Sequence, residues 1–195
     1  MRPIKACINL SALTFNLQSI KKIAKNSKVM AVLKANAYGH GLIESVKAIK
    51  NVEGIAILTI EEASKIRKAG YKNTILLLEG LFAAEEIYQA EKLNLNITLH
   101  NDRQIEFLDN VVLKNPVSVH LKINTGMNRL GFPPDQIDYL IENLNANPNV
   151  SDITLMTHFA SADEKEGITK QLDCFNSITD NYNLSSSVAN SAALY

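Results

Sequence analysis

The chain has 195 residues, of which 46% are hydrophobic and 21% charged, a composition typical of one globular domain. Its formal net charge is zero at pH 7, so no long-range field would attract nucleic acid or an acidic membrane, and we expect neither as a partner. Cys7 and Cys174 have neither disulfide-scaffold density nor metal-ligand spacing, and the N-terminus lacks an apolar signal segment. We therefore expect a cytoplasmic protein without a metal site.

Seven short apolar runs have the length and composition of β-strands. They are residues 29–34, 55–60, 74–79, 95–99, 117–123, 152–158 and 186–190. In the fourth run Leu95, Ile97 and Leu99 alternate with polar residues. The other runs are nearly continuous, as expected for parallel strands that are covered on both faces.

Amphipathic helical periods separate these runs. Their apolar positions are Leu42, Ile43, Val46 and Ile49; Ala63, Ile66 and Ala69; Ile87, Ala90 and Leu93; Ile105 and Leu108; and Ile137, Leu140, Ile141 and Leu144. Strand–helix alternation repeated this often predicts parallel strands with right-handed crossovers. Two architectures fit the pattern, a doubly wound open sheet and a (β/α)₈ barrel.

Polar residues near the carboxyl ends of several predicted strands favour the barrel, whose active sites are assembled at that end. These residues are Lys34, the segment 124–129, His158, Asn190 and Ser191. Seven strands are one fewer than a closed barrel needs, and a complete barrel typically takes about 250 residues. The sequence therefore predicts an α/β fold that is an incomplete (β/α)₈ TIM-type barrel.

The first candidate for chemistry is the segment KANAYGHG, residues 34–41. A lysine at a strand end commonly extends its ammonium to water. A partly desolvated amine can instead attack an aldehyde, and Tyr38 could donate its hydroxyl to the same ligand. Gly39 and Gly41 would let the backbone pass close to that ligand.

The second candidate is HLKINTGMNRLGF, residues 120–132. Arg129 offers a planar fork that suits a carboxylate or a phenolate oxygen, although a surface arginine after a turn is the simpler interpretation. Lys122 alternates with His120 and Asn124, so all three should point to one face of the strand. Basic groups on the inner face of a barrel are costly unless they are paired, which favours a functional role.

Two further segments complete the candidate site. His158, in MTHFASADE, ends a predicted strand, where a core histidine with a hydrogen-bond partner is the common alternative. Asn190 and Ser191, in ANSAALY, are expected to end the last strand and open a helix, whose N–H groups could bind phosphate, although an ordinary N-cap at Ser191 is the simpler interpretation. An amine, a phenol, a guanidinium, an imidazole and a phosphate cradle would together suit pyridoxal 5′-phosphate (PLP).

The segments VLKANAYGHG, LKINTGMNRLG, MTHFASADE and ANSAALY resemble the alanine racemase family, in that order and over the whole chain. The resemblance implies a PLP-dependent homodimer that interconverts L-alanine and D-alanine for peptidoglycan. It also implies two parts, an N-terminal barrel and a C-terminal β-domain. On this interpretation residues 1–195 are the PLP-binding barrel domain, ending before the eighth strand and the β-domain, and this chain alone is expected to be inactive.

The resemblance also implies roles for single residues. Lys34 corresponds to the lysine that holds PLP and serves as one of two bases, and Tyr38 to a tyrosine near the phosphate. Arg129 corresponds to the arginine that contacts the phenolic oxygen of the cofactor and the carboxylate of the substrate, and we expect Met127 beside that substrate. The family's second base is a tyrosine of the second subunit's C-terminal domain, which no residue of this chain matches.

The remaining correspondences concern the surroundings of the cofactor. His158 matches a histidine beside the cofactor ring, Ser191 matches a phosphate ligand, and we expect Asn190 to bind the cofactor with it. Lys122 matches a lysine that is carbamylated in many members and braces the arginine. Asn124 stands where the family commonly has aspartate, which removes a negative charge near this lysine.

Two other functions stay open on the sequence alone. One is a non-catalytic barrel that carries PLP, which the short length favours. The other is a related PLP barrel that acts on another amino acid. The segments AYGHG and TGMNRLG favour the racemase over both.

Overall fold

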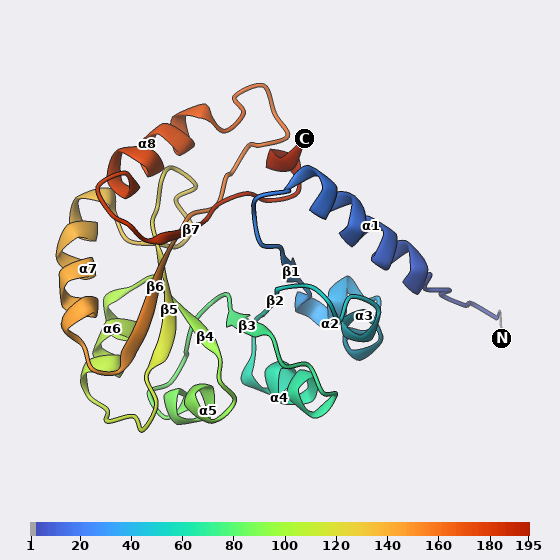
Figure 1. The fold of residues 1–195 in the computed structure, drawn as a ribbon, viewed down its shortest axis with the longest axis horizontal. Coiled ribbons are helices and arrows are strands. Elements are labelled where there is room, and N and C mark those ends of the chain that lie inside the picture. Colours follow the sequence, from blue (N-terminus) through green and yellow to red (C-terminus); the bar gives the residue numbers. More distant parts are fainter. Residues whose placement is uncertain (1–2) are drawn as a thin grey trace. The chain divides into compact units, whose positions relative to one another are not determined.

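The computed structural model describes residues 3–195 and divides into two compact units, Met1–Ile75 and Leu76–Tyr195. Within residues 3–195 no helix is both long enough and apolar enough to cross a membrane. Each unit is an alternation of parallel strands and helices (Figure 1).

The first unit begins with a helix and contains the first two strands. Its elements are α1 (Leu10–Ile23), β1 (Met30–Val32), α2 (Lys34–Tyr38), α3 (Leu42–Ala48), β2 (Gly54–Ile57) and α4 (Ile60–Lys68). β1 and β2 are parallel, with Ala31 opposite Ile55. α1 lies against α3, and the Thr14 hydroxyl donates to the Ala48 carbonyl at 2.9 Å.

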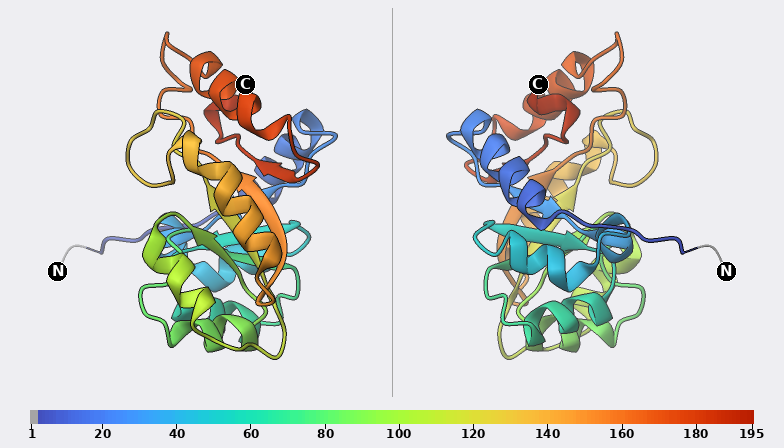
Figure 2. Two further views of the ribbon diagram at one scale, coloured as in Figure 1. Left: turned by 90° about the vertical axis from the view of Figure 1, so that its left-hand side faces the viewer. Right: turned by 90° about the vertical axis from the view of Figure 1, so that its right-hand side faces the viewer.

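The second unit carries the remaining strands, beginning with β3 (Thr74–Leu77) at the boundary. Its other elements are α5 (Glu86–Lys92), β4 (Asn96–Leu99), α6 (Asp102–Asp109), β5 (Val117–Lys122), the 3₁₀ turn η1 (Pro134–Gln136), α7 (Ile137–Ala146), β6 (Val150–Met156), α8 (Thr169–Thr179), β7 (Ser185–Ser187) and the 3₁₀ turn η2 (Ala192–Leu194). Each of the strands from β3 to β7 pairs in parallel with the next, and the strand order is the chain order from β1 to β7. In Figure 2, α7 runs along β6, which it contacts.

The predicted fold class is confirmed, because all seven expected strands are present, parallel and in chain order. Several predicted strands extend further towards the C-terminus than the observed strands do. β1 ends at Val32, β6 at Met156 and β7 at Ser187. Lys34, His158 and Asn190 therefore lie in the segments that follow the strands, where the backbone is free to leave the ladder and turn.

Three helices of the described residues were not predicted: α1, α8 and the five-residue α2. α1 begins at a polar cap, where the Asn9 side chain accepts from the Ala12 N–H, and none of its residues is fully buried. The N-terminal segment, which lacks an apolar signal segment, therefore contains a surface helix. α8 buries Gln171, Phe175 and Ile178, so a buried amide stands where a regular apolar stripe would have its first member.

The buried faces of the helices were mostly predicted correctly. The expected stripe of α7 is confirmed, since Ile137, Leu140, Ile141 and Leu144 are all buried. In α6 the face is rotated, because Ile105 is only half-buried while Gln104, Phe107 and Leu108 are buried. β4 is covered on both faces, as Thr98 is fully buried between its apolar neighbours.

Candidate functional site

The first candidate residue, Lys34, begins a left-handed helical turn. The four residues after it, Ala35, Asn36, Ala37 and Tyr38, all have φ between 52° and 55°. Left-handed backbone costs about 1–2 kcal/mol for each residue that carries a Cβ, so such a turn persists only where its surroundings fix it. Strained backbone of this kind concentrates at functional sites.

Hydrogen bonds on both sides hold this turn. The Ala37 N–H donates to the Leu33 carbonyl at 2.9 Å, and the His40 Nδ1–H donates to the Ala37 carbonyl at 2.8 Å. The Asn36 side chain accepts from the Leu42 N–H at 2.8 Å, at the start of α3. These hydrogen bonds therefore hold the small and amide residues of KANAYGHG in one defined turn.

Lys34 and Tyr38 are brought together by the turn. The Nζ atom of Lys34 lies 5.9 Å from the centroid of the Tyr38 ring, within the range of a cation–π contact. Lys34 is half-buried, and Tyr38 is 59% exposed. The amine and the phenol thus lie on one short, fixed segment with the phenol open to solvent.

In the second unit, the loop after β5 carries Met127 and Arg129. It leaves the strand at Ile123 and returns at Phe132, whose N–H donates to the Lys122 carbonyl at 2.8 Å. Met127 is half-buried and Arg129 is exposed. The loop therefore begins and ends at one point, with the arginine on its outer part.

Asn124 organises this loop. Its Oδ1 atom accepts from the N–H groups of Gly126 and Asn128 at 3.1 and 3.0 Å, and its Nδ2 donates to the Asn128 side chain at 3.0 Å. Asn124 therefore fixes the geometry of this loop. Lys122, the last residue of β5, is half-buried and interacts with a partner group.

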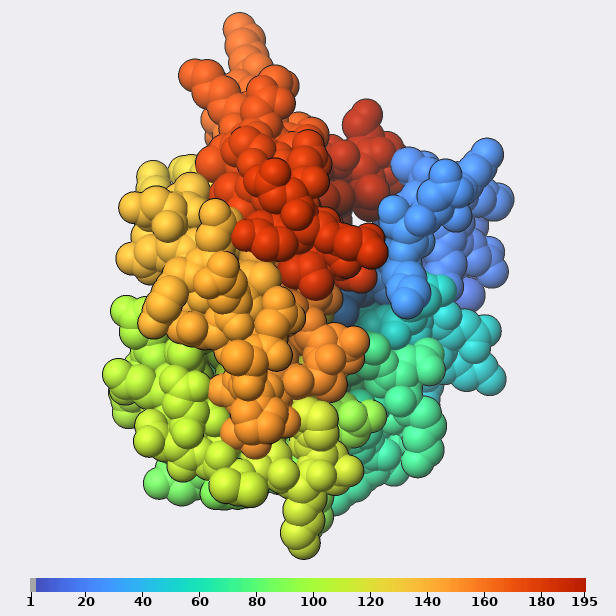
Figure 3. All heavy atoms as spheres, turned by 60° about the vertical axis from the view of Figure 1, so that its left-hand side comes forward, coloured from blue at the N-terminus to red at the C-terminus, as the bar shows by residue number. Residues whose placement is uncertain are grey.

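His158 lies in the loop after β6. It is half-buried, and its carbonyl accepts from the Gln171 Nε2 at 3.2 Å. The next carbonyl, that of Phe159, accepts from the Asn190 Nδ2 at 3.1 Å. The same loop continues into residues 163–166, which are exposed and belong to an orange arm that projects beside α8 (Figure 3).

Asn190 and Ser191 precede the 3₁₀ turn η2, a much shorter element than the expected helix. Asn190, not Ser191, provides the side-chain cap, because its Oδ1 accepts from the Ala193 N–H at 3.1 Å. Ser191 is exposed. A single 3₁₀ turn has little macrodipole, so a phosphate contact here would depend on the Ser191 hydroxyl and free N–H groups.

Sequence reasoning missed Gln171, the third residue of α8, which is 9% exposed. Its Oε1 accepts from the Ala160 N–H at 2.8 Å, while its Nε2 donates to the Thr125 hydroxyl and the His158 carbonyl, each at 3.2 Å. It therefore joins the loops after β5 and β6. The available signal was a polar residue at a buried helical position, where a hydrogen-bond partner is required.

His120, in the middle of β5, has a shifted pKa. This residue is 5% exposed, and burial lowers the pKa of its imidazole to about 4. Its register partners are Thr98 on β4 and Thr154 on β6. At neutral pH His120 is therefore uncharged and adds no positive charge to β5.

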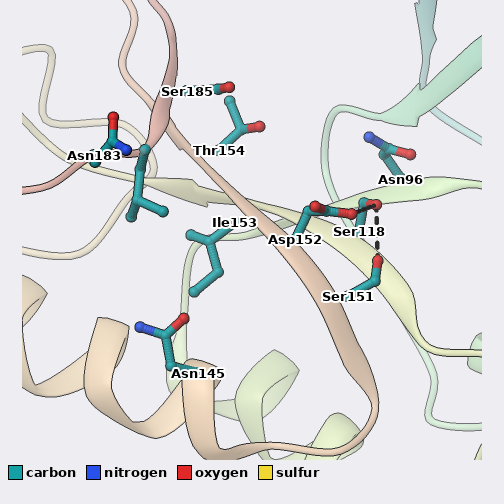
Figure 4. Close-up of a pocket in the computed structure, with 10 residues that line it drawn as sticks. Asn96, Ser118, Asn145, Ser151, Asp152, Ile153, Thr154, Asn183 and Ser185 are labelled. Atoms are coloured by element: carbon teal, nitrogen blue, oxygen red, sulfur yellow. Dashed lines mark hydrogen bonds between the residues drawn. The ribbon is translucent and has the colours of Figure 1, made fainter.

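A polar hollow of about 460 Å³ lies at the opposite end of the strands. Asn96, Ser118, Asp152 and Ser185 line it from the first residues of β4 to β7, and the Ser118 hydroxyl contacts both Ser151 and Asp152 (Figure 4). Barrel active sites lie at the carboxyl ends of the strands, so this hollow is separate from the candidate site.

Parallel strands in chain order, separated by helices and carrying polar loops at their carboxyl ends, define the barrel class of α/β proteins. Within that class, a model of the family described as "Alanine racemase, N-terminal domain" matches residues 8–195. The chain therefore belongs to the alanine racemase family.

Individual relatives agree with this assignment. The alanine racemase of Nitrosospira multiformis is 45% identical over 196 residues, which cover 99% of this chain and 55% of the relative. That of Burkholderia mallei is 41% identical over 193 residues, covering 99% and 54%. The crystal structure of the biosynthetic alanine racemase from Pseudomonas aeruginosa has a TM-score of 0.95 and 38% identity, covering 100% of this chain and 55% of that one. The chain spans about half the length of the relatives it matches.

Proposed function

We propose that this chain is the PLP-binding barrel portion of an alanine racemase, which interconverts L-alanine and D-alanine and so supplies D-alanine for the cell wall. Membership of the family supports the activity. The observation that carries the proposal to individual residues is the half-buried Lys34 at the start of a strained, hydrogen-bonded turn. The enzyme acts in the cytoplasm as a homodimer.

The residues present have the donor set that PLP requires. Lys34 supplies an amine for the aldehyde, and Tyr38 and Ser191 supply hydroxyl groups for the phosphate. Asn190 assists Ser191, and Arg129 supplies a fork for an anionic oxygen. When bound, PLP supplies a conjugated ring that accepts the electrons left at the α-carbon as the proton leaves.

The chain's own residues orient the substrate and move the proton. Arg129 binds the substrate carboxylate, next to Met127, and a charge-assisted contact of this kind fixes orientation as well as adding affinity. Lys34 removes or returns a proton at the α-carbon on one face. His158 would lie beside the cofactor ring, and Lys122, which the family resemblance suggests is carbamylated, would brace Arg129.

We also propose that racemase turnover needs more than residues 1–195. Exchange of the α-proton on both faces requires a second acid–base group opposite Lys34, and loss of such a group typically costs about 10²–10⁴-fold. The relatives are nearly twice as long as this chain, and their additional segment, with a second subunit, is the proposed source of that group. The 195-residue chain alone should bind PLP weakly and turn over L-alanine hardly at all.

The test is to trap PLP on the 195-residue chain with borohydride and to map the adduct by mass spectrometry. We expect the adduct on Lys34 and its loss in Lys34→Ala, while Lys28→Ala, a change at an exposed lysine of the same unit, leaves it unchanged. An adduct on other lysines but not on Lys34 would contradict the cofactor assignment. Conversion of L-alanine to D-alanine, measured in a complete enzyme that contains this barrel, separates a racemase from a PLP carrier. Other amino acids offered in parallel test the specificity.

A further inference from the structure

Two helices of the second unit begin with the same device, a buried glutamine at their third position. In α6 the residue is Gln104, and in α8 it is Gln171. Each side-chain amide accepts from a backbone N–H of its own preceding loop and donates to the loop of the preceding strand. We call these sets of hydrogen bonds the Gln104 bridge and the Gln171 bridge.

The Gln104 bridge joins the loops after β3 and β4. Its Oε1 accepts from the His100 N–H at 2.9 Å, and its Nε2 donates to the Glu79 and Leu81 carbonyls at 2.8 and 3.3 Å. None of the residues proposed to bind cofactor or substrate lies in these two loops. The Gln171 bridge joins the loops after β5 and β6, which contain Arg129 and His158.

The proton directions in the Gln171 bridge follow from its contacts. The Thr157 hydroxyl has a single proton, which it donates to the Ile123 carbonyl at 3.0 Å. The Thr125 hydroxyl, 2.7 Å away, must therefore donate to Thr157 and can accept from the Gln171 Nε2. The result is one continuous series of hydrogen bonds, from the Gln171 amide through both threonines to the carbonyl of Ile123, just after β5.

Burial favours a single arrangement of these hydrogen bonds. Gln171, Thr125 and Thr157 are 9%, 8% and 4% exposed, so water cannot readily replace a lost partner. An unsatisfied buried polar group costs more than an average hydrogen bond contributes. The two loops can therefore not shift independently while the bridge is intact.

We propose that Gln171 is a positioning residue, which fixes the loop of Arg129 relative to the loop of His158 for the cofactor and substrate. This inference rests on the proposed function. A carboxylate cannot replace the amide, as Glu62 illustrates in α4. Its Oε2 accepts from the Leu58 and Thr59 N–H groups of its own loop, and a carboxylate has no proton to donate to a second loop.

The experiment compares Gln171→Met and Gln171→Glu with the matched changes Gln104→Met and Gln104→Glu. Thermal melts measure folding, hydrogen exchange measures the protection of residues 124–129 and 158–160, and titration by absorbance measures the Kd of PLP. In a complete enzyme that contains this barrel, kcat and KM for alanine follow. Thr125→Val, which cuts the link between the loops without altering α8, is the second variant if the Gln171 changes fail to fold.

We expect both pairs of variants to lose similar stability, but only the Gln171 and Thr125 changes to weaken PLP binding and lower kcat/KM, by about 10- to 100-fold. Their hydrogen exchange should accelerate in the loops after β5 and β6. Equal effects of the Gln171 and Gln104 changes on PLP binding would overturn the positioning role while leaving the proposed function intact. A wild-type protein that takes up no PLP would overturn both, and that result is seen before any variant is compared.

Discussion

The Gln104 bridge and the Gln171 bridge are alike in chemistry and differ in how tightly they are packed. Beside Gln104, Gly80 has φ +69°, and a Cβ there would lie 2.2 Å from the Thr98 carbonyl oxygen. Beside Gln171, Gly126 has φ +133°, and a Cβ there would come no closer than 3.6 Å to any neighbour. The buried glutamine is therefore tightly packed where it joins the loops after β3 and β4. It has more space around it where it joins the loops that carry the proposed site.

This difference has a physical interpretation. In the loops after β3 and β4, residues 78–85 and 100–101, backbone groups contact the glutamine directly. The loops after β5 and β6, residues 123–133 and 157–168, are longer and carry the side chains proposed to bind a ligand, and their connection depends on side-chain hydrogen bonds. An added Cβ should therefore destabilise the fold more beside the Gln104 bridge, whereas loss of the glutamine contacts should affect function only at the Gln171 bridge.

The largest effect on stability is expected for Gly80→Ala. A Cβ that clashes with backbone, added to left-handed strain, should lower the free energy of unfolding by about 3–5 kcal/mol. Gly126→Ala should cost about 1–2 kcal/mol from backbone strain alone. Gly70→Ala, at φ +91° with no atom within 4 Å, is the control for strain without contact. Urea unfolding measures all three, and equal losses would show that the two bridges are packed alike.

Next in size is the effect of Arg129→Ala on turnover. Loss of a charge-assisted contact of about 1.5–3 kcal/mol should lower kcat/KM by about 10- to 150-fold in a complete enzyme with this barrel, with little change in melting temperature. The matched control is Arg103→Ala, beside Gln104, where the guanidinium lies 5.4 Å from the Phe107 ring and no site residue is near in the chain. If Arg129→Ala lowers stability and leaves the activity of each folded molecule unchanged, the arginine is structural.

His120, which lies opposite Thr98 in the strand register, should make the free energy of unfolding depend on pH by about 2 kcal/mol. Its folded pKa of about 4 lies below the usual value of 6.5, so the stability it contributes is full above pH 6.5 and is lost as the pH falls towards 4. Between pH 7.5 and pH 5 the wild type should lose about 2 kcal/mol more than His120→Asn. Parallel pH dependence of the two proteins in urea unfolding would show that His120 is not desolvated.

The smallest effects should have opposite signs in the two regions. The Thr98 hydroxyl is buried without a hydrogen-bond partner, so Thr98→Val should be neutral or raise the free energy of unfolding by up to about 1 kcal/mol. Thr157→Val leaves the Ile123 carbonyl and the Thr125 hydroxyl unpaired and should cost about 1–2 kcal/mol. Destabilisation by Thr98→Val as large as that by Thr157→Val would show that Thr98 has a partner of its own.

The sequence alone predicted the strands, their parallel order and most helical faces, because each follows from local periodicity and from burial. It also predicted the family, which the match over residues 8–195 confirms. The assignments of Lys34, Arg129, His158 and Ser191 to a cofactor remain predictions, which the experiments above test. The error at the strand ends arose because apolar runs continue past the last ladder hydrogen bond, so composition does not mark where the backbone turns.

Only the tertiary structure decided the left-handed turn after Lys34 and the two glutamine bridges. Nothing in KANAYGHG requires four consecutive residues at positive φ; contacts with Leu33 and with Leu42 at the start of α3 fix them there. Gln171 and Thr125 are 46 residues apart, and Gln104 and Glu79 are 25 apart. A glutamine at the third position of a helix is locally an ordinary polar residue. It becomes a connection between loops because parallel strands bring their carboxyl ends together, where a buried amide must find its hydrogen-bond partners among the backbone and side-chain groups of the two loops.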